Sequence, residues 1–429
     1  MRILVTGASG FIGAAICARM IAEGHAVVGA GRPGGSPLPR GLACEVTVDM
    51  ARAKSPDDWT PHLCNIEAVV NCAGLLQAGS AGTPSDLHIA GSDALFAACE
   101  AAGIRRIVQI SALGVGEDAP TEFARSKFLA DEALMVRDLD WVVLRPSVVL
   151  GRTAYGGSAL IRGLAGLPLL PVITRSGYLQ VVALDDVVET VAFCVRGDTP
   201  SRQVLELVGP ERLRFEGIVA AFRRWLGWPP AKTVRFPDAI GLLLFKLGDL
   251  AGRLGWRPPV RSTARKEILR GSIGDPEPWT KATGIEPRSL ALMLDTTPPS
   301  VQERWFAKLF FLKPLILIVF AAFWLVSGLI ALGPGYAEGV RIMQAAGVGA
   351  LAVPVVIGGA LADILLGLAI LYRPTAKPAL ITAFVLCIFY LVIGTVLVPA
   401  MWSTPLGVFT KVVPIMVLNL VALALLDGR

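Results

Sequence analysis

The first thirteen residues, MRILVTGASGFIG, restrict the fold of this chain more than any other stretch. The run Ile3–Val5 is apolar and is ended by glycines, a pattern typical of a buried parallel strand. Gly7, Gly10 and Gly13 follow at three-residue spacing, and the helix-favouring segment Ala14–Ala22 comes next. A strand, a glycine turn and a helix in this order predict a nucleotide-binding α/β domain.

The glycines have separate physical roles in such a turn. Gly7 permits the tight turn, Gly10 lets the backbone approach a pyrophosphate, and Gly13 lets the helix pack close to the strand. The free N–H groups and the positive end of the helix dipole then face the phosphates. The alternative is a glycine-rich turn without a ligand, which the flanking strand and helix disfavour. We therefore predict that a dinucleotide contacts Gly7, Ala8, Ser9, Gly10, Phe11, Ile12 and Gly13.

Repeated strand–helix units extend this pattern over residues 1–195. They give an α/β Rossmann fold, a doubly wound parallel sheet with helices on both faces and the glycine turn at its carboxyl edge. Apolar runs predict strands at His25–Ala30, Ala68–Cys72, Ile107–Ile110 and Trp141–Leu144, with helical segments such as Ser92–Ala102 and Ala124–Val136 between them.

Residues 196–300 follow a looser pattern with frequent Pro and Gly, and they are predicted to form a small subdomain. Within it, Ala239–Trp256 is rich in Leu and Gly, with Lys246, Asp249 and Arg253 interspersed. Its apolar residues could face the core of the subdomain or lie on a membrane surface. We expect the core, because the segment lacks a strongly cationic face.

Four long apolar runs follow a linker at residues 301–313. Each run has about 20 residues, which is enough to cross a hydrocarbon core of about 30 Å. The sequence therefore predicts an all-α membrane domain over residues 314–426 and a lipid bilayer as partner. The runs are Pro314–Leu332, Val348–Leu371, Ala379–Val398 and Leu406–Leu426.

Loop charges predict how these spans are oriented, because basic residues favour the cytoplasmic side. No signal sequence precedes the first strand, so we expect an inner (cytoplasmic) membrane protein with its Rossmann domain and both termini in the cytoplasm. Arg341, near Glu338, departs from the pattern. The supporting residues are Arg304, Lys308 and Lys313 before the first span, Arg373 and Lys377 between the second and third, and Arg429.

Composition narrows the function further. The net charge of +6 is modest and no Lys/Arg-rich run occurs, so no nucleic-acid partner is expected. Seven cysteines without a Cys-x-x-Cys pair are typical of reduced thiols in the cytoplasm.

Cys387 is the one cysteine after residue 313 and no His lies there, so neither a haem nor an iron–sulfur cluster is expected in the membrane domain, and no metal site is predicted. Asp363 and Lys411 lie in or near the spans, where ionisable residues are typical of functional sites.

The residues after the second strand bear on the choice of cofactor. An Asp or Glu there would bind the ribose 2′-hydroxyl of NAD(H), but this chain has Arg32, nineteen residues after Gly13. A guanidinium suits a 2′-phosphate, so we predict NADP(H) in preference to NAD(H). A solvated surface arginine is the alternative.

The motif T-G-x-x-G-x-x-G resembles the short-chain dehydrogenase/reductase superfamily, in its extended and atypical branches. The resemblance implies that residues 196–300 form a substrate-side subdomain. It also implies cofactor contacts beside the adenine ring, along the segment that begins with Asn71, and at the nicotinamide end. The residues concerned are Asp49 and Met50, then Cys72, Ala73 and Gly74, and finally Pro146, Ser147 and Val148.

The catalytic set of that superfamily is altered in this chain. Active members use a Ser and a Tyr-x-x-x-Lys motif, in which the Lys lowers the Tyr pKa and holds the nicotinamide ribose while the Tyr transfers the proton. Ser111 and Lys127 match the Ser and the Lys, but Phe123 occupies the tyrosine position. His88 falls where relatives often carry Asn, and it is either structural or a substitute acid.

Two more specific resemblances follow. Residues 1–300 resemble atypical reductases related to the 39 kDa accessory subunit of respiratory complex I, on the stretches Ile110–Gly114, Ala124–Lys127 and Leu139–Ser147. That subunit binds a dinucleotide without established turnover, and the resemblance makes membrane or respiratory complex subunits candidate partners. The last hundred or so residues resemble DoxX-like four-helix membrane domains.

These observations leave two main functions open. The first is a membrane-anchored NAD(P)H oxidoreductase with a lipophilic or quinone-like substrate, which the anchor, Ser111 and Lys127 support. The second is a non-catalytic dinucleotide-binding subunit that assembles a complex or senses redox state, which Phe123 supports. Sugar-nucleotide epimerisation is a weaker third, because it needs the missing Tyr and gives no role to an anchor.

Overall fold

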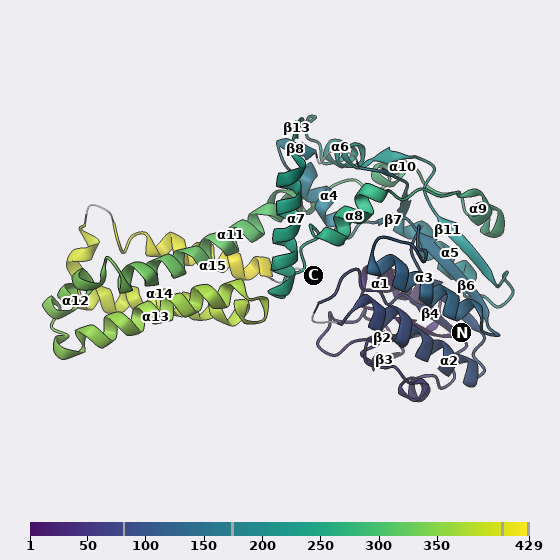
Figure 1. The fold of residues 1–429 in the computed structure, drawn as a ribbon, viewed down its shortest axis with the longest axis horizontal. Helices are drawn as coiled ribbons and strands as arrows, with labels where there is room; N and C mark the ends of the chain where they lie inside the picture. Colours follow the sequence, from purple (N-terminus) through teal and green to yellow (C-terminus); the bar gives the residue numbers. More distant parts are fainter. Residues whose placement is uncertain (80–81, 173–175, 405–406, 427–429) are drawn as a thin grey trace. The chain divides into compact units, whose positions relative to one another are not determined.

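The computed structural model describes residues 1–429 except 80–81, 173–175, 405–406 and 427–429 (Figure 1). The chain divides into two compact units. The first comprises Met1–Asp249 and Pro258–Ala307, and the second comprises Leu250–Arg257 and Lys308–Arg429.

A seven-stranded parallel sheet forms the centre of the first unit, in the order β11-β6-β5-β4-β1-β2-β3 (Figure 1). The strand order reverses at β1, so a crevice forms where the carboxyl ends of β1 and β4 meet. The predicted Rossmann fold is confirmed, with β3 as a strand that the sequence pattern did not indicate. The strands are β1 (Arg2–Thr6), β2 (Ala26–Gly31), β3 (Cys44–Thr47), β4 (Ala68–Asn71), β5 (Arg106–Ile110), β6 (Asp140–Pro146) and β11 (Gln203–Leu207).

Helices cover both faces of this sheet because alternate residues of each strand point to opposite sides. In β1, Ile3 and Val5 pack in one core cluster with α1 (Phe11–Ala22) and α5 (Leu184–Cys194). Leu4 belongs to a second cluster on the other face, which includes residues of α2 (Ser92–Ala101) and α3 (Glu122–Met135). Both clusters consist of buried side chains, so the sheet is a rigid base for the loops at its carboxyl edge.

Smaller elements complete the first unit. Three pairs of short strands lie outside the main sheet: β7 (Val148–Leu150) with β10 (Val181–Ala183), β8 (Leu169–Val172) with β13 (Lys232–Arg235), and β9 (Tyr178–Leu179) with β12 (Leu213–Arg214). The remaining helices are α4 (Gly156–Ala165), α6 (Phe215–Trp225), α7 (Asp238–Arg253), α8 (Ser262–Arg270), α9 (Glu277–Thr283) and α10 (Leu290–Asp295).

The helix α7 corrects one expectation. Its leucines were expected in the core of the subdomain, but Leu243, Leu244 and Leu247 are each at least half exposed, whereas Gly241 and Phe245 are buried. The two kinds of residue interleave along the helix, so α7 has a narrow packed stripe and a broad exposed apolar side. An apolar-rich composition therefore did not identify the buried face.

The second unit is helical, with α11 (Val301–Leu332), α12 (Tyr336–Ala345), α13 (Ala352–Leu371), α14 (Arg373–Leu397) and α15 (Val412–Leu426). The stretch 301–313, expected to be a linker, is helical and continuous with the first apolar run. Packing between α11, α13, α14 and α15 buries a cluster that includes Trp324, Leu366, Leu380 and Ala422.

Three helices in the described part of the chain have the length and apolar composition to cross a membrane, and they are α11, Gly349–Leu371 and α14. The predicted fourth span is not among them, because α15 has 15 residues and measures about 22 Å at 1.5 Å per residue. The start of that predicted span, Leu406, and the C-terminal Arg429 lie outside the described residues. Lys411, just before α15, is exposed.

Candidate active site

The glycine turn between β1 and α1 has the close packing that its sequence predicts. Gly7 has a φ of +62°, a backbone conformation that favours glycine. A Cβ at Gly13 would lie 2.3 Å from the Gly7 carbonyl oxygen, so only glycine lets α1 approach β1 this closely. Ala8 donates its N–H to the Ala30 carbonyl at 3.2 Å, which ties the turn to the end of β2.

The N-terminus of α1 can bind an anion beside the glycine turn. The helix begins at Phe11, and no side chain caps its N-terminus. Its first N–H groups are therefore available to an anion, and the helix dipole adds positive potential there. A backbone cradle that a Cβ would fill, next to an uncapped helix N-terminus, fits the pyrophosphate of a dinucleotide.

The residues predicted beside the adenosine lie at the ends of β2 and β3. Arg32 directly follows β2 and is partly buried, and no acidic residue occurs at the end of that strand. Asp49 accepts a hydrogen bond from the Ala51 N–H at 3.3 Å and lies 3.5 Å from the guanidinium of Arg52, which is largely exposed. Met50 is buried in the sheet-face cluster that includes Leu4.

Buried polar residues fix the backbone at the end of β4. Thr6 donates its hydroxyl to Asn71 Oδ1 at 2.5 Å, and the Asn71 amide donates to Gln109 at 2.8 Å. The Thr6 hydroxyl also accepts the N–H of Ala73 at 3.3 Å. This network places the backbone of Cys72, Ala73 and Gly74 beside the glycine turn, where a Cβ at Gly7 would lie 2.9 Å from the Ala73 nitrogen. Burial raises the pKa of the Cys72 thiol, so this cysteine is not a thiolate nucleophile at neutral pH.

Lys127 extends from α3 to the carboxyl ends of β4 and β5. Its ammonium donates to the carbonyl oxygens of Ile110 at 2.7 Å and Ala73 at 3.3 Å. Burial lowers the pKa of Lys127 to about 8. Phe123 lies one helical turn earlier on α3, where its ring offers no proton. The structure therefore brings together the cofactor cradle and the lysine without an acid at position 123.

Ser111 belongs to a buried network that the sequence did not indicate. Its hydroxyl donates to Asp131 Oδ2 at 2.8 Å, and the guanidinium of Arg145 donates to the same oxygen at 3.1 and 3.0 Å. Asp131 is fully buried, and burial raises the pKa of its carboxyl group. Asp131 also interacts with the charge of Lys127, four residues earlier on the same helix, and this i, i+4 spacing is the signal that could have found the network.

His88 lies in a π-helical segment, Asp86–Gly91, and both of its ring nitrogens have protein partners. Nε2 accepts the N–H of Leu75 at 3.0 Å, and Nδ1 lies 2.8 Å from the Ser126 hydroxyl. That hydroxyl donates to the Phe123 carbonyl at 3.0 Å, so it accepts the proton of Nδ1. Burial and the nearby Lys127 lower the pKa of His88 to about 2. Both ring nitrogens are therefore engaged by protein groups, and burial disfavours the protonated form of His88.

The segment predicted at the nicotinamide end lies at the carboxyl end of β6. The Pro146 carbonyl accepts the Leu113 N–H at 3.0 Å, and the Ser147 N–H donates to Leu207 at 3.0 Å. The Ser147 hydroxyl donates to that of Ser272 at 2.9 Å, so its side chain faces the smaller subdomain. Val148 begins β7. The predicted site residues therefore lie along the carboxyl edge of one sheet, as the fold requires.

Comparison with known protein families gives one match within each of the two compact units. Residues 7–163 match the family described as NAD(P)H-binding, and residues 321–420 match the DoxX-like family. The predicted resemblance to the complex I subunit is confirmed by a mitochondrial NADH dehydrogenase alpha subcomplex subunit 9 of Arabidopsis thaliana, which is 28% identical over 157 residues, or 35% of this chain and 38% of that protein.

Two further relatives are similar over about two thirds of this chain. A ceramide reductase of Caulobacter vibrioides is 27% identical over 291 residues, which is 66% of this chain and 88% of that protein. An uncharacterized protein of Mycobacterium tuberculosis is 28% identical over 285 residues, which is 64% of this chain. The matched region spans about a third of the length of the mycobacterial relative, at 31%.

Solved structures agree on the fold. A UDP-glucose 4-epimerase from Thermotoga maritima, determined with UDP-glucose, superposes with a TM-score of 0.52 and covers 69% of this chain and 98% of its own. Its sequence identity of 18% supports the fold alone.

Proposed function

Because this chain joins an NAD(P)H-binding domain of the short-chain reductase and epimerase type to a DoxX-like membrane domain, we propose that it is a membrane-anchored NADP(H) oxidoreductase that acts on a lipophilic, quinone-like substrate. The observation that carries the proposal is the combination at α3: Lys127 is held beside the cofactor cradle, while Phe123 replaces the proton donor. Relatives named as reductases of ceramide and of 2-alkyl-3-oxoalkanoates support a lipophilic substrate.

A quinone-like acceptor fits the missing acid. Bound NADPH supplies a hydride. A quinone that accepts it becomes a hydroquinone anion, which is stable enough to take its proton from water. A ketone would instead become an alkoxide and would need a positioned acid, worth about 10²–10⁴-fold in rate. Phe123 is therefore tolerated with a quinone and not with a ketone.

The test is NADPH oxidation by the full chain in detergent or lipid nanodiscs, with a short-chain ubiquinone as acceptor. We expect turnover with the quinone, little with ketones, and a large loss in Lys127→Met. Tight NADPH binding without turnover on any acceptor would overturn the proposal and favour the second candidate, a non-catalytic assembly or redox-sensing subunit of a membrane or respiratory complex. The engaged hydroxyl of Ser111 and the neutral His88 favour that candidate.

For localisation, we propose the inner membrane, with the dinucleotide domain in the cytoplasm and four crossings. The basic residues near the start of α11 (Arg304, Lys308 and Lys313) and at the start of α14 (Arg373 and Lys377) support this orientation. A reporter active only in the periplasm should be silent when fused at Arg429 and active when inserted at Ser403. Periplasmic activity at Arg429 would mean three crossings, with α15 failing to span.

A further inference from the structure

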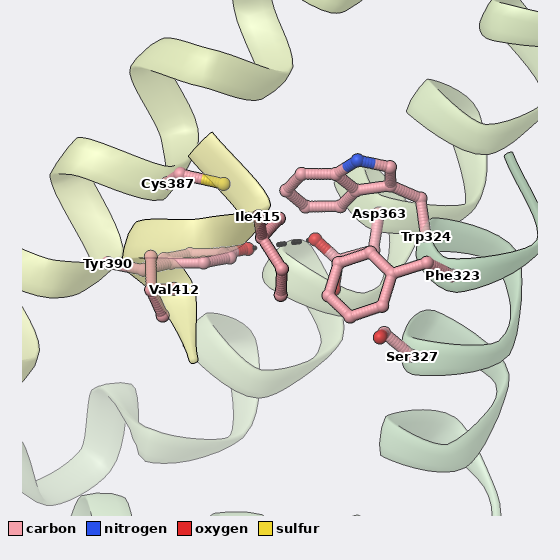
Figure 2. Close-up of a pocket in the computed structure, with 8 residues that line it drawn as sticks. All are labelled: Phe323, Trp324, Ser327, Asp363, Cys387, Tyr390, Val412 and Ile415. Atoms are coloured by element: carbon pink, nitrogen blue, oxygen red, sulfur yellow. Dashed lines mark hydrogen bonds between the residues drawn. The ribbon is translucent and has the colours of Figure 1, made fainter. Parts of the chain in front are cut away.

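The helical unit contains a pocket of about 150 Å³ that is remote in sequence from the dinucleotide site (Figure 2). Phe323 and Trp324 reach it from α11, Asp363 from α13 and Tyr390 from α14. Figure 2 shows the three aromatic side chains arranged around the carboxyl group of Asp363. The pocket thus combines one acidic group with three aromatic side chains, and Ser327, Cys387, Val412 and Ile415 complete its lining.

The Asp363 carboxyl group has no counter-charge in the described structure. Its side chain is nearly buried, and its hydrogen bond comes from the Tyr390 hydroxyl at 3.1 Å. It lies about 12 Å along α13 from Leu371, at 1.5 Å per residue, within a candidate membrane span. No Lys, Arg or His is among the residues that line the pocket. An ionised carboxylate in such a place is unfavourable unless a cation or further donors accompany it.

The aromatic wall indicates what kind of cation would fit. The faces of Trp, Tyr and Phe attract cations, and this attraction is stronger away from water. Trp324 is 2% exposed, so its ring lies away from water. A cavity of about 150 Å³ accommodates a group of the size of benzene. The pocket is therefore large enough for an alkylated ammonium head group and too small for a whole lipid.

We infer that this pocket binds the ammonium group of a lipophilic amine, with its hydrocarbon tail in the surrounding bilayer. Asp363 is the counter-ion, and Phe323, Trp324 and Tyr390 contact the N-alkyl groups. The inference is independent of the dinucleotide site and of the proposed reaction.

The test is calorimetric titration of the full chain in an uncharged alkyl-maltoside detergent, which carries no ammonium group, with decyltrimethylammonium below its micellar concentration and protein-free detergent as the blank. Decanol is the uncharged probe. We expect saturable binding of the ammonium with a stoichiometry of one, and at least about tenfold weaker binding in Asp363→Asn. The matched control is Glu338→Gln, which removes an exposed carboxylate paired with Arg341 and should leave the affinity unchanged.

Equal affinity for decanol and the ammonium, or unchanged affinity in Asp363→Asn, would overturn the inference and make the pocket a neutral cavity. Because Asp363→Asn could disturb helix packing, Trp324→Leu is a second variant that keeps an apolar wall. It should weaken binding of the ammonium several-fold and leave decanol unaffected. Equal weakening of both probes by this variant would also overturn the inference.

Discussion

The two ends of the dinucleotide site in the first unit depend on different parts of the chain. At the glycine turn, the geometry is made by backbone: a positive φ at Gly7, the 2.3 Å approach at Gly13 and an uncapped helix. At the α3 end, the carbonyl reduction of the short-chain reductases that this chain resembles requires one side-chain hydroxyl, and Phe123 lacks it. The contrast teaches that binding and proton transfer are separable here, because the loss of the phenol changes no contact of the cradle.

The largest effect is expected when the missing acid is restored at position 123, because this should change proton transfer and leave cofactor binding alone. Phe123→Tyr places a phenol one helical turn before Lys127, whose positive charge favours the phenolate. We expect carbonyl reduction with NADPH to rise by about 10²–10⁴-fold, with little change in NADPH affinity. The measurement is NADPH oxidation with a panel of long-chain 3-oxo compounds, alongside direct cofactor titration.

The matched control is Phe128→Tyr, which adds the same hydroxyl to the same helix one residue after Lys127, on another face. It should not change carbonyl reduction. Robust reduction by the unmodified chain, unaffected by Phe123→Tyr, would show that position 123 is not the site of the proton donor.

A smaller effect concerns the cradle itself. Arg32→Ala should weaken NADPH binding by roughly tenfold to a hundredfold, because a charge-assisted hydrogen bond contributes about 1.5–3 kcal/mol. NADH binding should change little, since NADH has no 2′-phosphate. Arg40→Ala removes the same charge from an exposed position of the same loop and serves as control. Equal affinities of the unmodified chain for the two cofactors would contradict the role of Arg32.

The sequence predicted the parts of this site that follow from local pattern. Strands next to glycine turns, and the positions of Gly7 and Arg32 relative to them, depend on neighbours along the chain, whereas Lys127 was assigned by its match to the short-chain reductase motif. The partners of Ser111 and His88 did not follow, because they depend on contacts between residues 13 to 38 positions apart, such as Ser111 with Asp131. The structure was needed to show that His88 is neutral and engaged at both nitrogens.

The second, helical unit shows the same limit, because contacts between distant segments cannot be predicted from a local sequence pattern. Hydropathy located three long helices, but it could not distinguish a short apolar helix such as α15 from a full span, since composition is alike in both. It also singled out Asp363 without its partner, because Tyr390 lies 27 residues later on another helix. In α7, the lack of a strongly cationic face led us to expect the leucines in the core, whereas Leu243, Leu244 and Leu247 are exposed, since burial depends on what packs against the helix.

The smallest predicted effect tests whether the charge of Lys127 contributes to NADPH binding. Burial lowers the pKa of this ammonium to about 8, so it loses its charge as pH rises through that value. The protonated form attracts the anionic dinucleotide, and binding should therefore be stronger below about pH 8 and weaker above it. When NADPH binding is measured from pH 7 to 9.5, the affinity should decline by no more than about tenfold, which corresponds to about 1.4 kcal/mol of binding free energy. Arg32→Ala should keep this decline, because a guanidinium stays charged throughout the range, whereas Lys127→Met should remove it. A decline that persists in Lys127→Met would assign the titration to another group and would separate Lys127 from cofactor binding.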